Sequence, residues 1–205
     1  MDRADVADLH YLTPIENLAS ICEHGILSHD LAAKLPHIDV SNPRMQDLRK
    51  DKEVAYAGQE RPRKLHSYAN LFLDGRNSML KDLCFTHGHQ KLAVVSVSTD
   101  VLDLPAVVIS DQNAASKYVH FYAAPAGLEH LSSQYVLARE WGDPTVDQID
   151  YWRRKSRRSA EVLVPDRVDP AYLHGAYMSC DDSCARCDAL GLSLVFVVDA
   201  DLFFQ

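Results

Sequence analysis

Eight short apolar runs recur along the chain, and they constrain its fold more than any other feature of the sequence. They are residues 9–12, 68–73, 92–98, 106–110, 119–122, 160–164, 173–178 and 194–198. Short runs rich in valine, isoleucine and aromatic side chains are typical of β-strands. The helical stretches between them are few and uneven, which argues against the regular alternation of a doubly wound sheet. We therefore predict a sheet-rich α+β fold.

The chain length of 205 residues suits a single domain that spans residues 1–205. No internal repeat or low-complexity linker divides it, and no apolar run is long enough to cross a membrane. The first ten residues are acidic and lack the basic start and apolar core of a secretion signal. The five cysteines are an odd number, which does not favour disulfides. We therefore expect a cytoplasmic protein.

Residues 13–25 carry the marks of a helix with two defined ends. Thr13, Pro14 and Glu16 fit a capping box, with Thr13 as the N-cap and Pro14 at the first helical position. Gly25 is typical of the residue that follows a helix C-terminus. The pattern predicts a helix that begins at Pro14 and ends before Gly25.

His10 and Tyr11 lie at the end of the strand that precedes this helix, on opposite faces of it. Amide donors at a helix N-terminus hold anionic ligands, so the two rings mark one candidate binding site. The alternative is that His10 packs under the helix while Tyr11 fills the core.

Three further polar segments are candidates for a site. Residues 45–52 look like a short polar helix that carries Arg49, for which a surface arginine is the alternative. In residues 66–80, four polar side chains crowd one strand and an Asp-Gly turn, namely His66, Tyr68, Asn70 and Arg76, and either a ligand pocket or a plain hairpin explains them. Residues 111–116 form a polar loop that either faces a cleft or is only a turn.

Glu161 stands at the start of a hydrophobic strand, directly after the basic run of residues 153–158. Buried carboxylates are rare unless they are paired or functional, so Glu161 is either a catalytic group or the partner of Arg158. The formal net charge of −8 does not suggest a nucleic-acid binder. Phosphate binding depends, however, on where cations cluster, and the alternative for the basic run is a solvated surface face.

Cys180, Cys184 and Cys187 have the CxxxCxxC spacing that some enzymes use to hold an iron–sulfur cluster. The same spacing places the three thiols on one face of a helix, where buried cysteines are the simpler explanation. A structural zinc ion would need a fourth ligand, for which His174 is the nearest candidate. We expect no metal site.

With these segments in view, the chain resembles the DarT family of DNA ADP-ribosyltransferases, which are toxins of toxin–antitoxin pairs. Four blocks carry the resemblance, namely residues 10–28, 45–51, 66–82 and 159–168, and residues 189–205 look like the C-terminal end of the family. Their order and spacing are more specific than any single block. The resemblance covers essentially the whole chain.

The resemblance implies an ADP-ribosyltransferase-like fold, in which a central split and twisted β-structure is flanked by helices and NAD lies between two sheets. It implies an enzyme that breaks the nicotinamide–ribose bond of NAD and attaches ADP-ribose to a base in single-stranded DNA. The alternatives are transfer to protein or RNA, and a silent NAD-binding module. A macrodomain antitoxin that removes ADP-ribose is the implied partner, and the target base is left open.

The site residues follow from the resemblance, position by position. Glu161 and Arg49 are implied as the catalytic residues. The NAD site is implied at His10, Tyr11, Thr13, Asn17, Arg49, Tyr68, Phe72 and Met79. The DNA site is implied on a basic loop with Arg153, Arg154, Lys155 and Arg157, where Tyr151 and Trp152 serve as stacking platforms. The commoner family order is Tyr-His-x-Thr, so the His10-Tyr11 order leaves open which ring contacts nicotinamide.

The implied chemistry suits these residue types. Nicotinamide leaves through an oxocarbenium-like transition state, which acceptor groups near the ribose stabilise. Glu161 would accept a hydrogen bond from the ribose 2′-hydroxyl and take the proton of the attacking base. Arg49 would bind phosphate oxygens or steady the departing charge with its planar fork.

Overall fold

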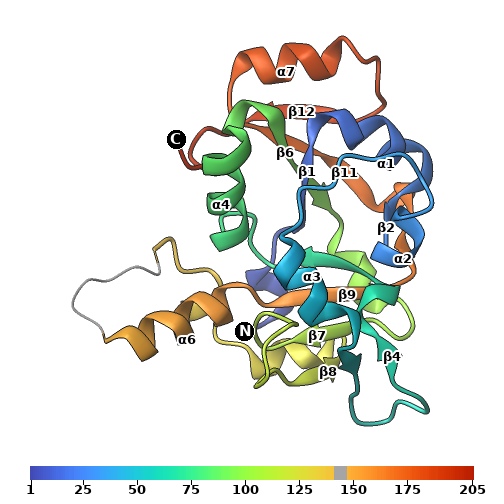
Figure 1. Cartoon of the computed structure of the whole chain (residues 1–205), viewed down its shortest axis with the longest axis vertical. Helices are drawn as coiled ribbons and strands as arrows, with labels where there is room; N and C mark the ends of the chain where they lie inside the picture. Colours follow the sequence, from blue (N-terminus) through green and yellow to red (C-terminus); the bar gives the residue numbers. More distant parts are fainter. Residues whose placement is uncertain (141–146) are drawn as a thin grey trace.

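The computed structural model describes residues 1–140 and 147–205 (Figure 1). Within these residues eight strands form one mixed sheet in the order β12-β11-β6-β1-β5-β9-β7-β8. The strands are β1 (Leu9–Pro14), β5 (Tyr68–Phe72), β6 (Leu92–Val97), β7 (Val108–Ser110), β8 (Phe121–Ala123), β9 (Glu161–Pro165), β11 (Leu173–Met178) and β12 (Val195–Val198). Each of the eight predicted runs is therefore a strand, with ends displaced by at most two residues.

The sheet is split between β1 and β5. β1 pairs with β6 along its whole length, from Leu9↔Val97 to Pro14↔Leu92. Between β1 and β5, by contrast, the described residues pair at His10↔Phe72 alone. The two halves run in different directions from this point (Figure 1). The expected split β-structure is thus confirmed, and His10 lies where the halves meet.

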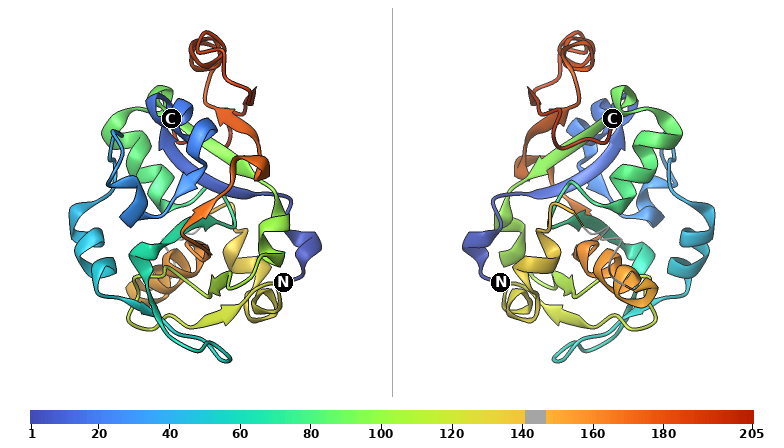
Figure 2. Two further views of the ribbon diagram at one scale, coloured as in Figure 1. Left: turned by 90° about the vertical axis from the view of Figure 1, so that its right-hand side faces the viewer. Right: turned by 90° about the vertical axis from the view of Figure 1, so that its left-hand side faces the viewer.

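Two small two-stranded sheets and seven α-helices surround the large sheet in the described part of the chain. The small sheets pair β2 (Ile26–Leu27) with β10 (Arg167–Val168) and β3 (Glu53–Val54) with β4 (Arg63–Lys64). The helices are α1 (Leu18–His24), α2 (His29–Ala32), α3 (Pro43–Lys50), α4 (Ser78–His87), α5 (Ser133–Val136), α6 (Gln148–Arg158) and α7 (Asp181–Asp188). The helix α7 stands beyond β12 at one end of the molecule (Figure 2). None of the described helices is long and apolar enough to span a bilayer.

The predicted helix start at Pro14 is wrong. Strand β1 continues through Thr13 and Pro14, a 3₁₀ turn follows, and α1 begins at Leu18. The capping box does not form, because Thr13 and Pro14 are paired with β6 and the Thr13 hydroxyl donates to the Pro14 carbonyl. The predicted end is confirmed, since Gly25 has φ +81° and donates to the Ile21 carbonyl.

Three other local predictions had mixed outcomes. The polar helix that carries Arg49 is confirmed as α3. The basic run is part of helix α6 rather than a loop, and this helix is capped by Asp147, which accepts from the Asp150 N–H. The hairpin at Asp74 is wrong, because Asn77 accepts from two amides and so starts α4 directly after β5.

Apolar side chains cover both faces of the sheet, as the alternation along the strands requires. The larger cluster lies on one face and includes Leu9, Val95 and Val162. A second cluster on the other face packs Leu12 and Val94 against residues of α4 and the C-terminal segment. These two packed layers lie on either side of the place where β1, β5 and β9 come together, which we call the mouth of the split.

Candidate active site

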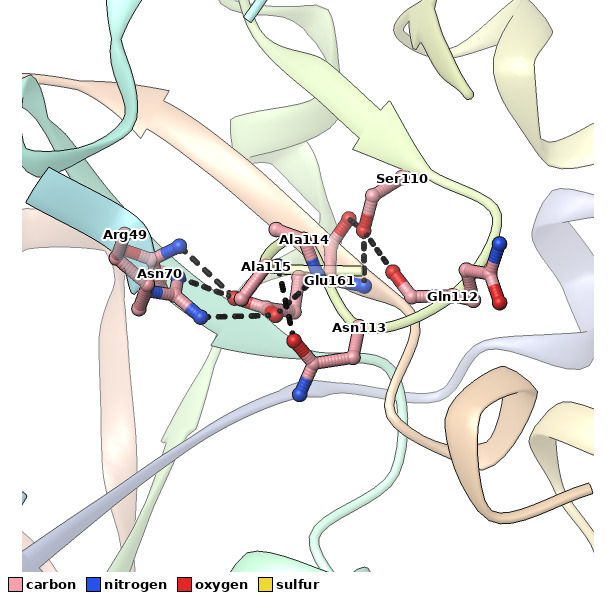
Figure 3. A network of polar contacts seen from close by, with 8 residues as sticks. All are labelled: Arg49, Asn70, Ser110, Gln112, Asn113, Ala114, Ala115 and Glu161. Atoms are coloured by element: carbon pink, nitrogen blue, oxygen red, sulfur yellow. Dashed lines mark hydrogen bonds and ion pairs between the residues drawn. The ribbon is translucent and has the colours of Figure 1, made fainter. Parts of the chain in front are cut away.

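Glu161 and Arg49 form a buried ion pair at the start of β9. The Arg49 Nη2 atom donates to Glu161 Oε2 at 2.8 Å, and its Nη1 donates to Oε1 at 3.2 Å (Figure 3). The side chain of Glu161 is 1% exposed and that of Arg49 is 14% exposed. Such a two-pronged contact compensates a carboxylate for its loss of water. The alternative prediction, that Glu161 pairs with Arg158, is wrong, because Arg158 pairs with Asp74.

Two further donors complete the surroundings of the Glu161 carboxylate. The Asn70 amide donates to Oε2 and the Ala114 backbone N–H donates to Oε1, each at 2.9 Å. With the two bonds from Arg49, each carboxylate oxygen accepts two hydrogen bonds, which is about its full capacity. The group is therefore held in one orientation, and a ligand that bonds to it has to displace a present donor.

Ser110 ties the backbone of Glu161 to the 111–116 loop. The Ser110 hydroxyl accepts from the Glu161 N–H at 3.0 Å and donates to the Gln112 carbonyl at 2.7 Å. Both Ser110 and Ala114 are fully buried. The loop therefore faces the site with its backbone. The polar composition of residues 111–116 was the reason to expect this loop at a cleft. Nothing in the sequence singled out Ala114 as a donor.

His10 lies on the same face of the sheet as Glu161. The pairs His10↔Phe72 and Phe72↔Glu161 place the three residues in one row across β1, β5 and β9, and directly opposite side chains share a face. The His10 Nδ1 atom is buried and has no hydrogen-bond partner in the described part of the chain. Burial lowers the pKa of His10. Tyr11 points to the opposite face and packs against the larger core cluster, where burial raises its pKa.

Thr13 and Asn17 are bonded to each other at the far end of β1. The Asn17 amide donates to the Thr13 hydroxyl at 3.3 Å and to the Ile38 carbonyl at 2.9 Å, and its oxygen accepts from the Ile38 N–H at 2.9 Å. Asn17 thus holds the segment that leads into α3. The pair therefore ties the end of β1 to the segment that precedes α3, the helix that carries Arg49.

The remaining residues assigned to NAD lie at different depths. Phe72 and Met79 are half-buried and pack against the cluster beneath α4. Tyr68 is 1% exposed and belongs to a third apolar cluster, with the Arg63 guanidinium 5.3 Å from its ring centre. The structure therefore places Phe72 opposite His10 and packs Met79 against the same apolar cluster as Phe72, and it leaves Tyr68 in the protein interior.

Helix α6 carries cations and aromatic rings on several sides of its surface. The Tyr151 and Trp152 rings meet edge to face with centroids 5.3 Å apart, and the Lys155 amine lies 5.5 Å from the Trp152 ring. Arg153 is exposed, and Arg157 lies 4.9 Å from the ring of Tyr135 on α5. Arg154 borders a hollow of about 250 Å³ beside α5. Exposed cations among flat rings are suited to a single nucleic-acid strand.

Arg158 differs from the rest of the basic run because it is buried. Its side chain is 1% exposed and donates to Asp74 at 2.9 Å and to the Arg76 carbonyl at 2.6 Å. Burial lowers the pKa of Arg158. The last residue of α6 therefore anchors the helix to the link between β5 and α4.

The predicted cysteine helix is α7, but the expectation of three buried thiols is wrong for two of them: Cys187 is buried, whereas Cys184 is half-buried, as is Cys180 at the N-cap. Burial raises the pKa of Cys187 to about 11, which keeps it a thiol. His174 lies 3.2 Å from Asp8, rather than completing a cysteine site. In the residues that the structure describes, no group of three or more potential ligands is placed to hold a metal ion.

The fold is that of an ADP-ribosyltransferase. Thermus sp. 2.9 DarT in complex with ADP-ribosylated ssDNA is 17% identical and superimposes with a TM-score of 0.79, over 98% of this chain and 97% of that one. Thermosipho africanus DarTG in complex with ADP-ribose is 25% identical with a TM-score of 0.80, over 97% of this chain and 51% of that one. The expected fold class is confirmed.

The family model described as "ssDNA thymidine ADP-ribosyltransferase, DarT" matches residues 10–204, so the chain belongs to the DarT family. A DNA ADP-ribosyl transferase-DNA ADP-ribosyl glycohydrolase fusion protein from Thermosipho africanus (strain H17ap60334) is 32% identical over 180 residues. That match covers 84% of this chain and 42% of the fusion protein, so the chain spans less than half the length of this relative.

Proposed function

We propose that this chain transfers ADP-ribose from NAD to thymidine in single-stranded DNA and releases nicotinamide. The observation that carries the proposal is the buried Glu161–Arg49 pair at the mouth of the split sheet, in a chain of the DarT family. Residues 1–205 act as one ADP-ribosyltransferase domain, because β1 lies at the centre of the sheet and the C-terminal segment packs on the same core.

Glu161 has two roles in the transfer, one toward the ribose of NAD and one toward the attacking base. Its carboxylate accepts a hydrogen bond from the 2′-hydroxyl of the nicotinamide ribose and stabilises the positive charge that develops on the ribose. It then takes the proton from the attacking base nitrogen, as a positioned general base does. Since all of its acceptor positions are occupied, one donor leaves when the ribose arrives.

Arg49 is the donor best placed to leave. Its Nη1 contact of 3.2 Å is the longest of the four, and its side chain is the partly exposed member of the pair. A guanidinium that turns from Glu161 to a phosphate oxygen keeps two hydrogen bonds, because its fork fits both anions. Arg49 would thereby bind the pyrophosphate while it frees one position on Glu161.

The groups around His10 suit the nicotinamide end of NAD. The buried Nδ1 atom of His10 offers a polar contact on the face that carries Glu161. Phe72 and Met79 supply apolar surface beside it, while Thr13 and Asn17 border the split from β1. Of the two rings in the His10-Tyr11 pair, His10 contacts the nicotinamide, and Tyr11 and Tyr68 support the site from the core.

Helix α6 binds the DNA. Arg153, Arg154, Lys155 and Arg157 track the phosphates, and Tyr151 and Trp152 stack with bases at about 1–3 kcal/mol for each base. The helix ends directly before β9, which brings the bound strand close to Glu161. An acidic protein can bind DNA in this way because its cations gather on one element, and the affinity then falls steeply with salt.

A second enzyme that removes ADP-ribose from DNA is the partner we propose. The Thermosipho relative joins a transferase and a glycohydrolase in one chain, which supports a toxin paired with a macrodomain antitoxin. A DNA acceptor also favours a cytoplasmic location for this chain.

Expression of the chain alone should inhibit growth, and Glu161→Ala should relieve the inhibition. Equal inhibition by both would contradict the toxin role.

The acceptor is tested by incubating the protein with NAD and one of four samples: a thymidine-containing oligonucleotide, the same oligonucleotide without thymidine, RNA, or protein. Mass spectrometry then follows the gain of ADP-ribose. We expect the gain on the thymidine oligonucleotide alone and its loss with Glu161→Ala. A gain on RNA or protein with unmodified DNA would favour the alternative acceptors, and a gain on both oligonucleotides would exclude thymidine specificity.

A further inference from the structure

The Ala114 N–H is the one backbone donor among the four that hold the Glu161 carboxylate, and it sits on a loop that is tied down at several points. Ala114 is fully buried, 2.9 Å from Glu161 Oε1. On its far side, Asn113 accepts from the Ala115 N–H, and the Lys52 amine donates to the Ser116 carbonyl (Figure 3 shows the Asn113 contact). A shift of this loop therefore shifts a bond to the carboxylate.

The near side of the same loop is tied to the last turn of α6. The Asn113 N–H donates to the Ser156 carbonyl at 2.9 Å, and the Ser156 hydroxyl donates to the Gln112 side-chain oxygen at 2.9 Å. The Gln112 carbonyl in turn accepts from Ser110, which holds the Glu161 N–H. A continuous set of hydrogen bonds thus runs from α6 through residues 110–114 to both the backbone and the side chain of Glu161.

We propose that Gln112 and Ser156 are positioning residues that couple the basic helix α6 to the Glu161 carboxylate. This inference rests on the proposed function, in which α6 binds the DNA acceptor. A DNA strand that binds the cations of α6 also fixes the last turn of this helix. The hydrogen bonds of Ser156 then fix the position of the loop. Ala114 then holds Glu161 in the orientation that the transfer needs, so the carboxylate is best ordered when the acceptor is bound. Small displacements of reacting groups have large effects on rate, so the coupling acts on kcat.

The test compares Gln112→Ala, Ser156→Ala and the double variant in transfer to a thymidine oligonucleotide. We expect each single variant to lower kcat about 10-fold with the KM for DNA changed less than about twofold. The double variant should be no slower than Gln112→Ala, because Gln112→Ala already removes the bond that Ser156→Ala removes, together with the bond from the Gln112 amide to the Tyr118 carbonyl. Ser156→Thr, which retains the hydroxyl, should restore most of the rate, and Gln90→Ala, at an exposed position outside α6, serves as the matched control.

Three results would overturn the inference: an unchanged kcat, losses that multiply in the double variant, or a rate for Ser156→Thr as low as that for Ser156→Ala. Urea denaturation of every variant separates a loss of folded enzyme from a loss of rate, and a kcat loss that disappears after correction for the folded fraction also counts against the coupling. A wild type that does not modify DNA would overturn the proposed function, and this inference with it. A wild type that modifies DNA, with variants whose kcat is unchanged, would overturn the inference alone.

Discussion

At the scale of single residues, Glu161 is the position where a small chemical change should have the largest effect. In Glu161→Gln the side chain keeps its size, but its NH₂ group faces Arg49 together with either Ala114 or Asn70, all of which are donors. We expect the rate of transfer to fall at least about 10³-fold, because the negative charge and the base are both lost. Release of nicotinamide measures the rate, and calorimetry should show NAD affinity within a few-fold of wild type. Glu53→Gln, on the surface strand β3, is the control. Transfer at a tenth of the wild-type rate or more would remove Glu161 from the mechanism.

His10 should make the stability of the protein depend on pH. Burial lowers its pKa below the ordinary value of 6.5, and burial also lowers the pKa of His66. Between the folded and unfolded pKa values the unfolded chain binds more protons, so the free energy of unfolding falls as pH drops below about 6.5. Urea midpoints at about pH 7.5 and pH 5.5 should therefore differ less in His10→Gln than in wild type, with His66 supplying the rest. His87→Gln, at an exposed position, is the control. His10 is not the source of the pH dependence if the two urea midpoints of His10→Gln differ as much as those of wild type, or if His87→Gln reduces this difference more than His10→Gln does.

At the scale of elements, α6 should supply the salt dependence of DNA binding. Arg153→Ala and Lys155→Ala each remove one cation from the surface of α6, so each should weaken binding of any single DNA strand to a similar degree. The slope of log K against log salt should decrease by about 0.7 for each phosphate that the variant no longer neutralises. Fluorescence anisotropy with a labelled oligonucleotide measures this. Arg167→Ala, an exposed arginine on β10, should leave the slope unchanged. An equal effect at Arg167 would place the DNA elsewhere.

The strands were predictable from the sequence because their apolar runs are local, whereas the order of the sheet depends on pairings between distant residues. The failure at Thr13 has the same cause. Thr13 and Pro14 favour a helix start locally, but pairing with Ala93 and Leu92 of β6 extends the strand through them. The resemblance implied a loop at the basic run, whereas Asp147, a residue type that favours a helix N-cap, indicates the helix that the structure shows there.

The site was predictable in part, and the limit again lies in long-range contacts. Arg49 and Glu161 followed from the resemblance, and the structure brings them into contact although 112 positions separate them. Asn70 was noted among the polar residues of its strand. Its bond to Glu161 depends on the register of β5 with β9, and the bond from Ala114 depends on a loop backbone. No side-chain pattern indicates a backbone donor.

At the scale of the whole molecule, the two halves of the split sheet need ties other than the single pair at His10. Arg76 supplies one, because its Nη1 donates to the carbonyls of Asp201 and Phe203 at 2.6 and 2.9 Å. The C-terminal segment, which follows β12 in one half, is thereby fastened to the link that leaves β5 in the other.

Phe203 should be the apolar counterpart of this tie. It is 3% exposed and packs in the cluster formed with Leu12 of β1 and Leu80 of α4. Phe203→Ala leaves a cavity where these elements meet, so the free energy of unfolding should fall by about 3–5 kcal/mol. Phe85→Ala on α4, where the ring is 71% exposed, should change it by less than about 0.5 kcal/mol. Urea unfolding followed by circular dichroism compares the two. If the two variants unfold at the same midpoint, the packing of Phe203 does not hold the halves together, and the Arg76 bonds with the pairing at His10 have to suffice.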